Sequence, residues 1–396
     1  MKLPKGWKTG HVADFGKLVT GSTPSTANDA FFGGDIPFVT PGDLGGAAAV
    51  TRSERTLTIA GADQCRRIPA GSVLVVCIGS TIGKTGRAGV DLVTNQQINA
   101  VVPNADTCGT FAFYEVSRIA KEFRRLAGTQ AVPILSKSEF GDFPVNLPPL
   151  PEQRKIADIL TTWDEALSKL DDLIAAQELR KKALMQRLLS RSSAHSQTCH
   201  AQHRLGDVIE RVTRRNTVAS TNVLTISAQG GLVNQQEYFN RSVAAEDLSG
   251  YYLLRQGEFA YNRSSAKGYP FGAIKRLDNY DQGVVSTLYL CSRLRDGAQA
   301  SSAYLCHYFE GGYLNSGLRM IAKEGARAHG LLNVTADEFF DLDIFLPALP
   351  EQQKIAEILD TADQQLTLLR TQRSALDQQK RGLMQHLLTG KLRVKI

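Results

Sequence analysis

Residue types suited to binding a phosphate gather in a glycine-rich segment of this 396-residue chain. Gly79-Ser-Thr-Ile-Gly-Lys-Thr85 follows an apolar, β-branched run and resembles a nucleotide-binding phosphate loop. That pattern requires a glycine where this chain has Ile78, and a second extended run follows instead of a helix. We therefore interpret the segment as a glycine-rich turn that presents Thr81 and Lys84 and could touch a DNA backbone.

An aromatic and basic stretch, Tyr261-Asn-Arg-Ser-Ser-Ala-Lys-Gly-Tyr269, lies between two runs that read as strands. A loop at this place would present guanidinium, amide, hydroxyl and ring groups together. These groups read base edges and anchor phosphates. A solvated hairpin tip explains the stretch equally well, and residues 211–215 and 324–330 are similar basic loops.

The residues that most often hold metals or perform catalysis do not form a convincing set. His195, Cys199, His200 and His203 have a spacing that loosely suggests zinc. Small polar residues surround them, as in a linker, and no second ligand pair occurs elsewhere. We find no nucleophile triad, no paired carboxylates, no dinucleotide-binding glycine motif and no Asn-Pro-Pro-Tyr or Asp-Pro-Pro-Tyr tetrapeptide. We expect neither a catalytic residue nor a bound metal in this chain.

The elements that must position these loops are defined by an internal repeat. Residues 147–160 return as residues 346–359, and the match continues without a gap to Leu189 and Leu388. A repeat this long indicates a duplicated unit. The chain is therefore expected to consist of two half-molecules in tandem.

Each repeated segment is predicted to be one long helix. Pro151 and Pro350 stand at the first helical position, and each is followed by a glutamate, which the helix N-terminus favours. Apolar residues then recur at spacings of four and three, which is typical of a coiled-coil seam. The seam residues are Ile156, Leu160, Trp163, Leu167, Leu170 and Ile174 in the first copy, and Ile355, Leu359, Leu366, Leu369, Leu383 and Leu387 in the second. The breaks in the two seams fall at matching places, which favours two helices that face each other over two unrelated exposed helices.

Chain order predicts that this helix pair is antiparallel. The second globular block leaves one helix and enters the other, so we expect one block at each end and a pseudo-twofold axis between them. The predicted class is α+β: two mixed domains, mainly of antiparallel strands, joined by two long helices that form an antiparallel coiled coil. The expected ranges are 1–146 (first domain), 147–191 (central helix), 192–346 (linker and second domain) and 347–396 (C-terminal helix and tail).

The composition is compatible with an anionic partner without requiring one. The net charge is +7 and the calculated pI is about 9.0. Six cysteines without a CxxC pair read as reduced thiols of a cytosolic protein. No signal peptide and no transmembrane run is evident, so a cytoplasmic location is expected.

Several segments of the chain resemble the specificity subunit of Type I restriction-modification systems. The resemblance rests on the twice-used Leu-Pro-x-Leu-Pro-Glu-Gln-x-Lys-Ile-Ala segment, and it extends over essentially the whole chain. Further segments that carry it are Thr20–Ser25, Gly34–Leu44, Gly257–Asn262, Gly268–Ile274 and Leu387–Leu392.

This resemblance implies two target recognition domains, each reading one half of a split, asymmetric DNA site, with the helices setting the spacing. The candidate DNA-contacting residues are Ser22, Thr81, Lys84, Arg211, Arg214, Arg215, Asn262, Arg263, Lys267, Tyr269 and Arg327. The implied partners are double-stranded DNA, two methyltransferase subunits and two motor-nuclease subunits. S-adenosylmethionine, ATP and Mg²⁺ are expected only in those partners.

Charged residues outside the seam are candidates for docking the methyltransferase, with a merely solvated face as the alternative. They are Lys155, Asp158 and Asp164, with their copies Lys354, Glu357 and Asp363. Two other readings of the whole chain remain. It could be an assembly scaffold whose domains bind protein, or a degenerate enzyme that uses the loop of Lys84.

Overall fold

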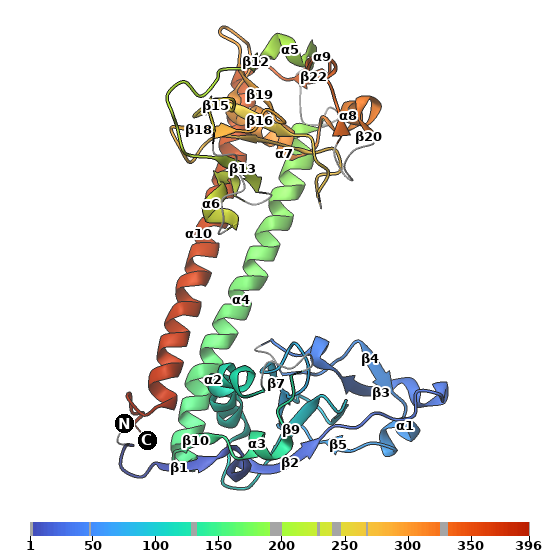
Figure 1. Cartoon of the computed structure of the whole chain (residues 1–396), viewed down its shortest axis with the longest axis vertical. Coiled ribbons are helices and arrows are strands. Elements are labelled where there is room, and N and C mark those ends of the chain that lie inside the picture. The colour runs from blue at the N-terminus through green and yellow to red at the C-terminus, as the bar shows by residue number, and fades with distance from the viewer. Residues whose placement is uncertain are drawn as a thin grey trace. The chain divides into compact units, whose positions relative to one another are not determined.

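The computed structural model describes residues 3–46, 49–127, 133–190, 200–227, 230–239, 247–266, 268–324 and 332–395. Two compact units make up the chain: residues 1–173 with 369–396, and residues 174–368. Each unit contains one globular domain and parts of both long helices (Figure 1). We call the globular part of unit 1 domain 1 and that of unit 2 domain 2.

Domain 1 is built on a four-stranded antiparallel sheet with the order β2-β9-β6-β7. These strands are β2 (Gly16–Thr20), β6 (Val73–Val76), β7 (Thr85–Arg87) and β9 (Ile98–Pro103). A second sheet, ordered β4-β3-β8-β5, contains β3 (Phe32–Val39), β4 (Arg55–Leu57), β5 (Arg67–Ile68) and β8 (Leu92–Thr94). Only the β3–β8 pair is parallel among these strands, so the expectation of mainly antiparallel pairing holds.

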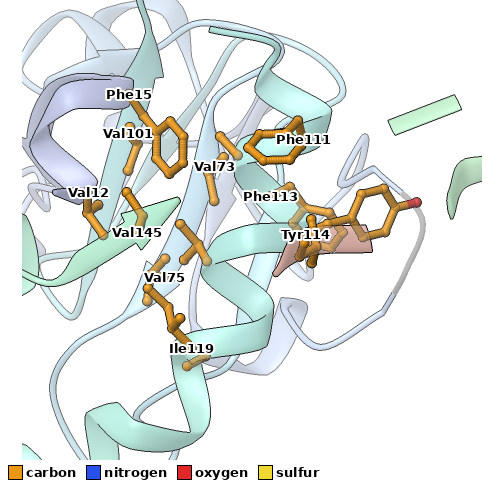
Figure 2. Close-up of a cluster of buried hydrophobic side chains, with 14 of the residues drawn as sticks. Val12, Phe15, Val73, Val75, Val101, Phe111, Phe113, Tyr114, Ile119 and Val145 are labelled. Atoms are coloured by element: carbon orange, nitrogen blue, oxygen red, sulfur yellow. The ribbon is translucent and has the colours of Figure 1, made fainter. Parts of the chain in front are cut away.

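The core of domain 1 lies between the first sheet and helix α2 (Gly109–Leu126). Successive side chains of a strand point to opposite faces. Val73 and Val75 of β6 therefore pack with Phe111 and Ile119 of α2 (Figure 2), whereas Leu74 belongs to a separate cluster on the other face. Because both faces are covered, β6 is buried at all four positions, which explains its uninterrupted apolar sequence.

Domain 2 repeats this architecture. Its four-stranded antiparallel sheet has the order β12-β19-β16-β17 and is covered by helix α7 (Ser302–Glu310). The strands are β12 (Ile209–Val212), β16 (Phe259–Asn262), β17 (Ala273–Arg276) and β19 (Leu290–Leu294). Each domain therefore has its own four-stranded sheet of the same topology, although the two sequences have little in common.

The strand registers make the two sheets equivalent residue by residue. The matching pairs are Val73–Arg87 with Phe259–Arg276 across the hairpin, and Val73–Val101 with Phe259–Ser292 across the sheet. The turn before each of these central strands holds a glycine, Gly71 or Gly257, with φ at 84°. That conformation strains any residue with a Cβ atom, so both domains use glycine at the same point.

The two predicted long helices are present, as α4 (Leu150–Leu189) and α10 (Leu349–Leu388). In unit 1, the carboxylate of Asp171 accepts a hydrogen bond from Arg373 Nε at 3.0 Å, and Asp164 pairs with Lys380. In unit 2, Gln177 Nε2 donates to Gln365 Oε1 at 2.7 Å, and Lys181 pairs with Asp363 at 2.5 Å. Within each unit, partners with higher numbers on α4 have lower numbers on α10, so the helices run antiparallel as expected.

Among the predicted seam residues, Ile156, Leu160 and Leu387 belong to the core cluster of domain 1, and Ile355 and Leu359 belong to that of domain 2. Ile156, Leu160, Leu167, Ile355, Leu359, Leu366 and Leu387 are buried, and Trp163, Leu170, Ile174, Leu369 and Leu383 are half-buried. Partial burial is expected along a pair of helices, because two helices alone cannot enclose a seam residue from every side.

Short elements complete each domain at matching places. Strand β1 (Lys8–His11) pairs with β10 (Pro144–Leu147), and β11 (Ala201–Arg204) pairs with β22 (Asp343–Leu346). The remaining helices are α1 (Ile59–Asp63), α3 (Lys137–Gly141), α5 (Leu205–Val208), α6 (Gln235–Phe239), α8 (Asn315–Ile321) and α9 (Ala336–Phe340). The remaining strands are β13 (Leu224–Ser227), β14 (Gly231–Asn234), β15 (Tyr252–Arg255), β18 (Gln282–Val285), β20 (Lys323–Glu324) and β21 (Leu332–Asn333).

Candidate nucleic-acid interface

Three loops meet at one end of the four-stranded sheet of domain 1. Strands β2 and β6 end there, and β7 and β9 begin there, because neighbouring strands are antiparallel. The loops are residues 21–24, 77–84 and 95–97, which we call the loop end of domain 1. Backbone bonds join them: Gly21 N donates to Ile98 O at 2.9 Å, and Cys77 N donates to Gln97 O at 2.8 Å.

The loop end of domain 1 contains all three candidate contacts predicted for this domain. Ser22 Oγ accepts a hydrogen bond from Arg66 N at 2.9 Å, and Lys84 Nζ donates to Pro41 O at 3.3 Å. Thr81 is half-buried in the same loop as Lys84. Residues that are far apart in the sequence are therefore brought together, and two of them also brace neighbouring backbone.

The equivalent loop end of domain 2 consists, among the described residues, of 213–215, 263–266, 268–272 and 286–289. It contains the predicted candidates Arg214, Arg215, Arg263 and Tyr269. Arg215 occupies the position equivalent to that of Ser22. Each residue follows the first residue of its strand, Ile209 of β12 or Gly16 of β2, by the same number of positions. These four candidates thus lie at a place equivalent to that of Ser22, Thr81 and Lys84 in domain 1.

Three of the domain 2 candidates, Arg214, Arg263 and Tyr269, form two or more side-chain hydrogen bonds with other parts of the chain. The guanidinium of Arg214 forms two hydrogen bonds, of 3.1 and 3.2 Å, with the buried carboxylate of Glu258. The guanidinium of Arg263 donates to Leu288 O at 2.9 and 3.1 Å and to Val334 O at 2.9 Å. These two arginines stabilise the loop end through hydrogen bonds inside domain 2.

Tyr269 is fixed in a similar way. Its hydroxyl donates to Glu310 Oε1 at 2.6 Å and accepts from Lys275 Nζ at 2.9 Å. Burial, followed by the hydrogen bond to Glu310, raises the pKa of Tyr269 above its ordinary value, so the phenol stays neutral.

Arg211 and Arg215 are exposed, whereas Asn262 is half-buried. Arg211 lies on β12, and the guanidinium of Arg215 donates to Gly250 O and covers the ring of Tyr252 at 4.9 Å. Asn262 Oδ1 accepts a hydrogen bond from Ser264 N at 3.2 Å. Lys267 and Arg327 lie outside the described residues.

The sequence reasoning missed two exposed side chains at the loop ends. Gln96 is exposed, and its Oε1 accepts a hydrogen bond from Thr23 Oγ at 2.7 Å. Leu288 is 60% exposed at the loop end of domain 2. The run Asn95-Gln96-Gln97 between two apolar strands was a usable signal for the first of these, since amides read base edges.

The sequence reasoning also missed two buried glutamines that join the domains to the long helices. Gln153 Oε1 accepts from Cys108 N at 2.9 Å, and its amide donates to Pro148 O at 2.9 Å and Asp106 O at 3.2 Å. Gln352 repeats these contacts in unit 2. It accepts from Ser301 N at 2.9 Å and donates to Pro347 O at 2.8 Å and Gln299 O at 3.1 Å.

Two of the predicted docking residues lie in contacts between the long helices. Asp164 accepts from Tyr114 Oη at 2.6 Å and forms an ion pair with Lys380. Asp363 pairs with Lys181 at 2.5 Å. The other four, Lys155, Asp158, Lys354 and Glu357, are exposed on the outer surface of the helices.

A metal site, a reactive cysteine and a membrane-spanning helix would each require particular residues or properties in the described part of the chain. The residues that the structure describes include no group of three metal-ligating side chains, and His195 and Cys199 lie outside that part of the chain. Burial raises the pKa of Cys77 to about 11, which keeps it a protonated thiol. No helix in the described ranges is long and apolar enough to cross a membrane.

Comparison with known families gives one family model that covers most of the chain. The model for the Type I restriction modification DNA specificity domain matches residues 4–176 and 296–378. These ranges include domain 1, α7 and most of both long helices.

Characterised relatives agree with this match. The chain is 30% identical over 172 residues to the Type I restriction enzyme MjaIX specificity subunit of Methanocaldococcus jannaschii, covering 42% of this chain and 40% of the relative. It is 31% identical over 151 residues to the HindI specificity subunit of Haemophilus influenzae, covering 37% of this chain and 33% of the relative. The MjaVIII specificity subunit of M. jannaschii aligns at 22% identity with 100% of this chain and 95% of its own length.

Solved structures share the fold. The S subunit of a Type I restriction-modification system from M. genitalium superimposes with a TM-score of 0.59 at 14% identity, over 98% of both chains. A chain from a structure of a type I R-M system gives 0.58 at 16% identity, over 99% of this chain and 100% of that one.

Proposed function

We propose that this chain, which belongs to the family of the Type I restriction modification DNA specificity domain, selects the DNA sequence on which a restriction-modification complex acts. Domain 1 would read one half of a split, asymmetric site and domain 2 the other half. The paired helices α4 and α10 would set the spacing between the halves. The chain itself would perform no catalysis.

The observation that carries this proposal is the common position of the candidate contacts in the two domains. Thr81 and Lys84 belong to a glycine-rich turn, and Arg263 and Tyr269 belong to an aromatic and basic stretch of unlike sequence. Both stretches form the loop between the equivalent strand pairs β6–β7 and β16–β17. Equivalent loops with different side chains suit two domains that read different half-sites.

The partners follow from the same assignment. Double-stranded DNA would lie at the loop ends, and two methyltransferase subunits would dock on the exposed helix residues Lys155, Asp158, Lys354 and Glu357. Two motor-nuclease subunits would join the same complex. S-adenosylmethionine, ATP and Mg²⁺ would bind in those subunits and not in this chain, and the complex would act in the cytoplasm.

Methylation mapping of cells that express this chain with a cognate methyltransferase tests the proposal. We expect N6-methyladenine in a split motif on both strands, and its loss when the chain is deleted. Replacing domain 2 with that of another specificity subunit should change one half of the motif and leave the other half and the spacer unchanged. If no methylated motif depends on the chain, an assembly scaffold that binds protein becomes the better reading.

A further inference from the structure

We propose that one turn in each domain reads a base pair of its half-site: Gln96 in the turn between β8 and β9, and Leu288 in the turn between β18 and β19. The Gln96 amide would bind the major-groove edge of an adenine, and the Leu288 methyl groups would contact the methyl group of a thymine. This inference rests on the proposed function and assigns specificity to particular side chains.

The two turns are equivalent in position and in local geometry. In domain 1, Asn95 Oδ1 accepts from Gln97 N at 3.2 Å, and Ile98 N donates to Asn95 O at 3.2 Å. In domain 2, Ser286 Oγ accepts from Leu288 N at 3.3 Å, and Tyr289 N donates to Ser286 O at 3.0 Å. A side chain that bonds to the backbone two residues onward holds both turns in the same conformation.

Each turn is also braced against its neighbouring loop. Gln97 accepts from Asn95 Nδ2 at 2.9 Å and donates to Ile78 O at 3.4 Å, at the start of the β6–β7 loop. In domain 2 the guanidinium of Arg263, from the β16–β17 loop, holds the carbonyl of Leu288 with two hydrogen bonds. A side chain on a braced backbone can discriminate between ligands because little freedom is lost when it binds.

The amide of Gln96 is oriented for binding by a single contact. Its oxygen accepts the Thr23 hydroxyl at 2.7 Å, and the side chain is exposed. The oxygen keeps a second lone pair, and the nitrogen keeps donors that can face a ligand. An amide donates to adenine N7 and accepts from adenine N6, and this pattern identifies adenine in the major groove.

Leu288 offers the opposite chemistry in the equivalent turn of domain 2, one position further along: the registers make Thr287 the equivalent of Gln96, and Leu288 the equivalent of Gln97. The Leu288 side chain is 60% exposed, beside the exposed Thr287. A single exposed leucine is ordinary on a protein surface. This leucine differs because it lies at the loop end, and Arg263 holds its backbone carbonyl with two hydrogen bonds. An aliphatic side chain at this place can recognise a thymine methyl group.

Methyl transfer by the full complex, assembled from this chain and its methyltransferase subunits, tests the Gln96 assignment. The substrates are duplexes that carry the mapped motif with one base pair changed at a time. With Gln96→Ala, we expect discrimination to fall about ten- to a hundredfold at one A·T pair in the half read by domain 1, and to stay within twofold elsewhere. When 7-deazaadenine replaces the adenine of that pair, the rate of methyl transfer by the wild-type complex should fall by a similar factor. The rate of the Gln96→Ala complex should not fall further.

Asn104→Ala is the matched control. Asn104 is an exposed amide at the opposite end of β9, and its Nδ2 donates to Asp14 O at 2.9 Å. This substitution should leave discrimination unchanged at every position.

The Leu288 assignment has an equally direct test. Replacing the contacted thymine by uracil removes one methyl group, which should reduce the wild-type rate about fourfold, the equivalent of burying one methyl. Leu288→Ala should be insensitive to the same replacement. Only the half read by domain 2 should respond.

The outcomes separate this inference from the proposed function. If the wild-type complex methylates a motif that depends on this chain but Gln96→Ala and Leu288→Ala discriminate as the wild type does, the base-reading turns are disproved and the proposed function stands. A uniform loss at all positions would also overturn them, because it indicates a phosphate contact. If no motif depends on the chain, both proposals fall together.

Discussion

At the scale of single residues, two buried glutamines occupy matching positions in the repeat. Gln153 and Gln352 are 4% and 0% exposed, and each satisfies one backbone N–H and two carbonyl groups. Those groups lie at the N-terminus of α2 or α7 and in the turn before the long helix. One amide therefore ties each domain to its helix, and its loss leaves buried groups without partners.

Replacing one of these glutamines should destabilise its own domain. We expect Gln352→Ala to lower the free energy of unfolding of unit 2 by about 2–4 kcal/mol, since it leaves Ser301 N unpaired and opens a cavity. Urea unfolding and hydrogen exchange at the start of α7 would measure the change. Gln353→Ala is the control, because this neighbour is exposed and should change stability by less than about 0.5 kcal/mol. Equal effects of the two substitutions would contradict the role assigned to Gln352.

At the scale of elements, two related ion pairs join α4 to α10. Asp164 pairs with Lys380, and Asp363 pairs with Lys181; the repeat relates each aspartate to the other and each lysine to the other. Lys181 and Lys380 are two of the four polar residues that interrupt the predicted seams; the other two are Gln177 and Arg373. A charged pair within an apolar seam fixes the register, because a shifted helix would leave both charges buried without partners.

The more buried of these pairs should matter more for stability. The side chains of Asp164 and Lys380 are 12% and 14% exposed, against 44% for Asp363. We expect Asp164→Ala to cost about 2–4 kcal/mol, because it also removes the acceptor of Tyr114, and Asp363→Ala to cost less. Thermal or urea unfolding of the variants measures this order. The control is Glu122→Ala in the exposed pair of Glu122 and Arg125, which should cost at most about 0.5 kcal/mol. An equally small cost for Asp164→Ala would show that burial does not strengthen the pair of Asp164 and Lys380.

At the scale of the whole molecule, the chain uses one scaffold twice and varies only what the scaffold carries. Two equivalent sheets, two equivalent glutamine ties and two related ion pairs recur, whereas the loop ends differ in length and chemistry. Each domain folds around its own core, so a change in one domain should leave the fold of the other intact. Its helices are uninterrupted over 40 residues each, which suits a spacer of defined length.

Lengthening both helices should lengthen the spacer in the methylated motif. Four residues inserted after Asp172 and four after Thr371 add about 6 Å of helical rise, and one base pair takes about 3.4 Å. We therefore expect the spacer to grow by one to two base pairs while both half-sites stay the same. Methylation mapping measures the spacer length directly. The control is a variant in which the four residues after Asp172 and the four after Thr371 are replaced by the inserted sequences, so that the helices keep their length. An unchanged spacer in an active variant would rule out the helices as the ruler.

The sequence by itself determined the repeat, the two long helices and their antiparallel pairing. The helices follow from local patterns: Pro151 and Pro350 lie in their first turns, and the spacing of Ile156, Leu160 and their copies defines one apolar side. The antiparallel pairing follows from the order of the segments along the chain. The resemblance carried by the same segments led to the family. The sequence also marked the loops of Lys84 and Arg263 as suited to DNA.

Only the tertiary structure decided that these loops are equivalent and which of their side chains are accessible. Equivalence depends on strand register, which is set by pairing between distant segments and leaves no common sequence behind. Accessibility depends on partners that the sequence does not specify: Arg263 and Tyr269 are occupied within the fold, whereas Gln96 and Leu288 are exposed. A side chain's type states what it can bind, but its neighbours in space decide whether it remains available to bind anything else.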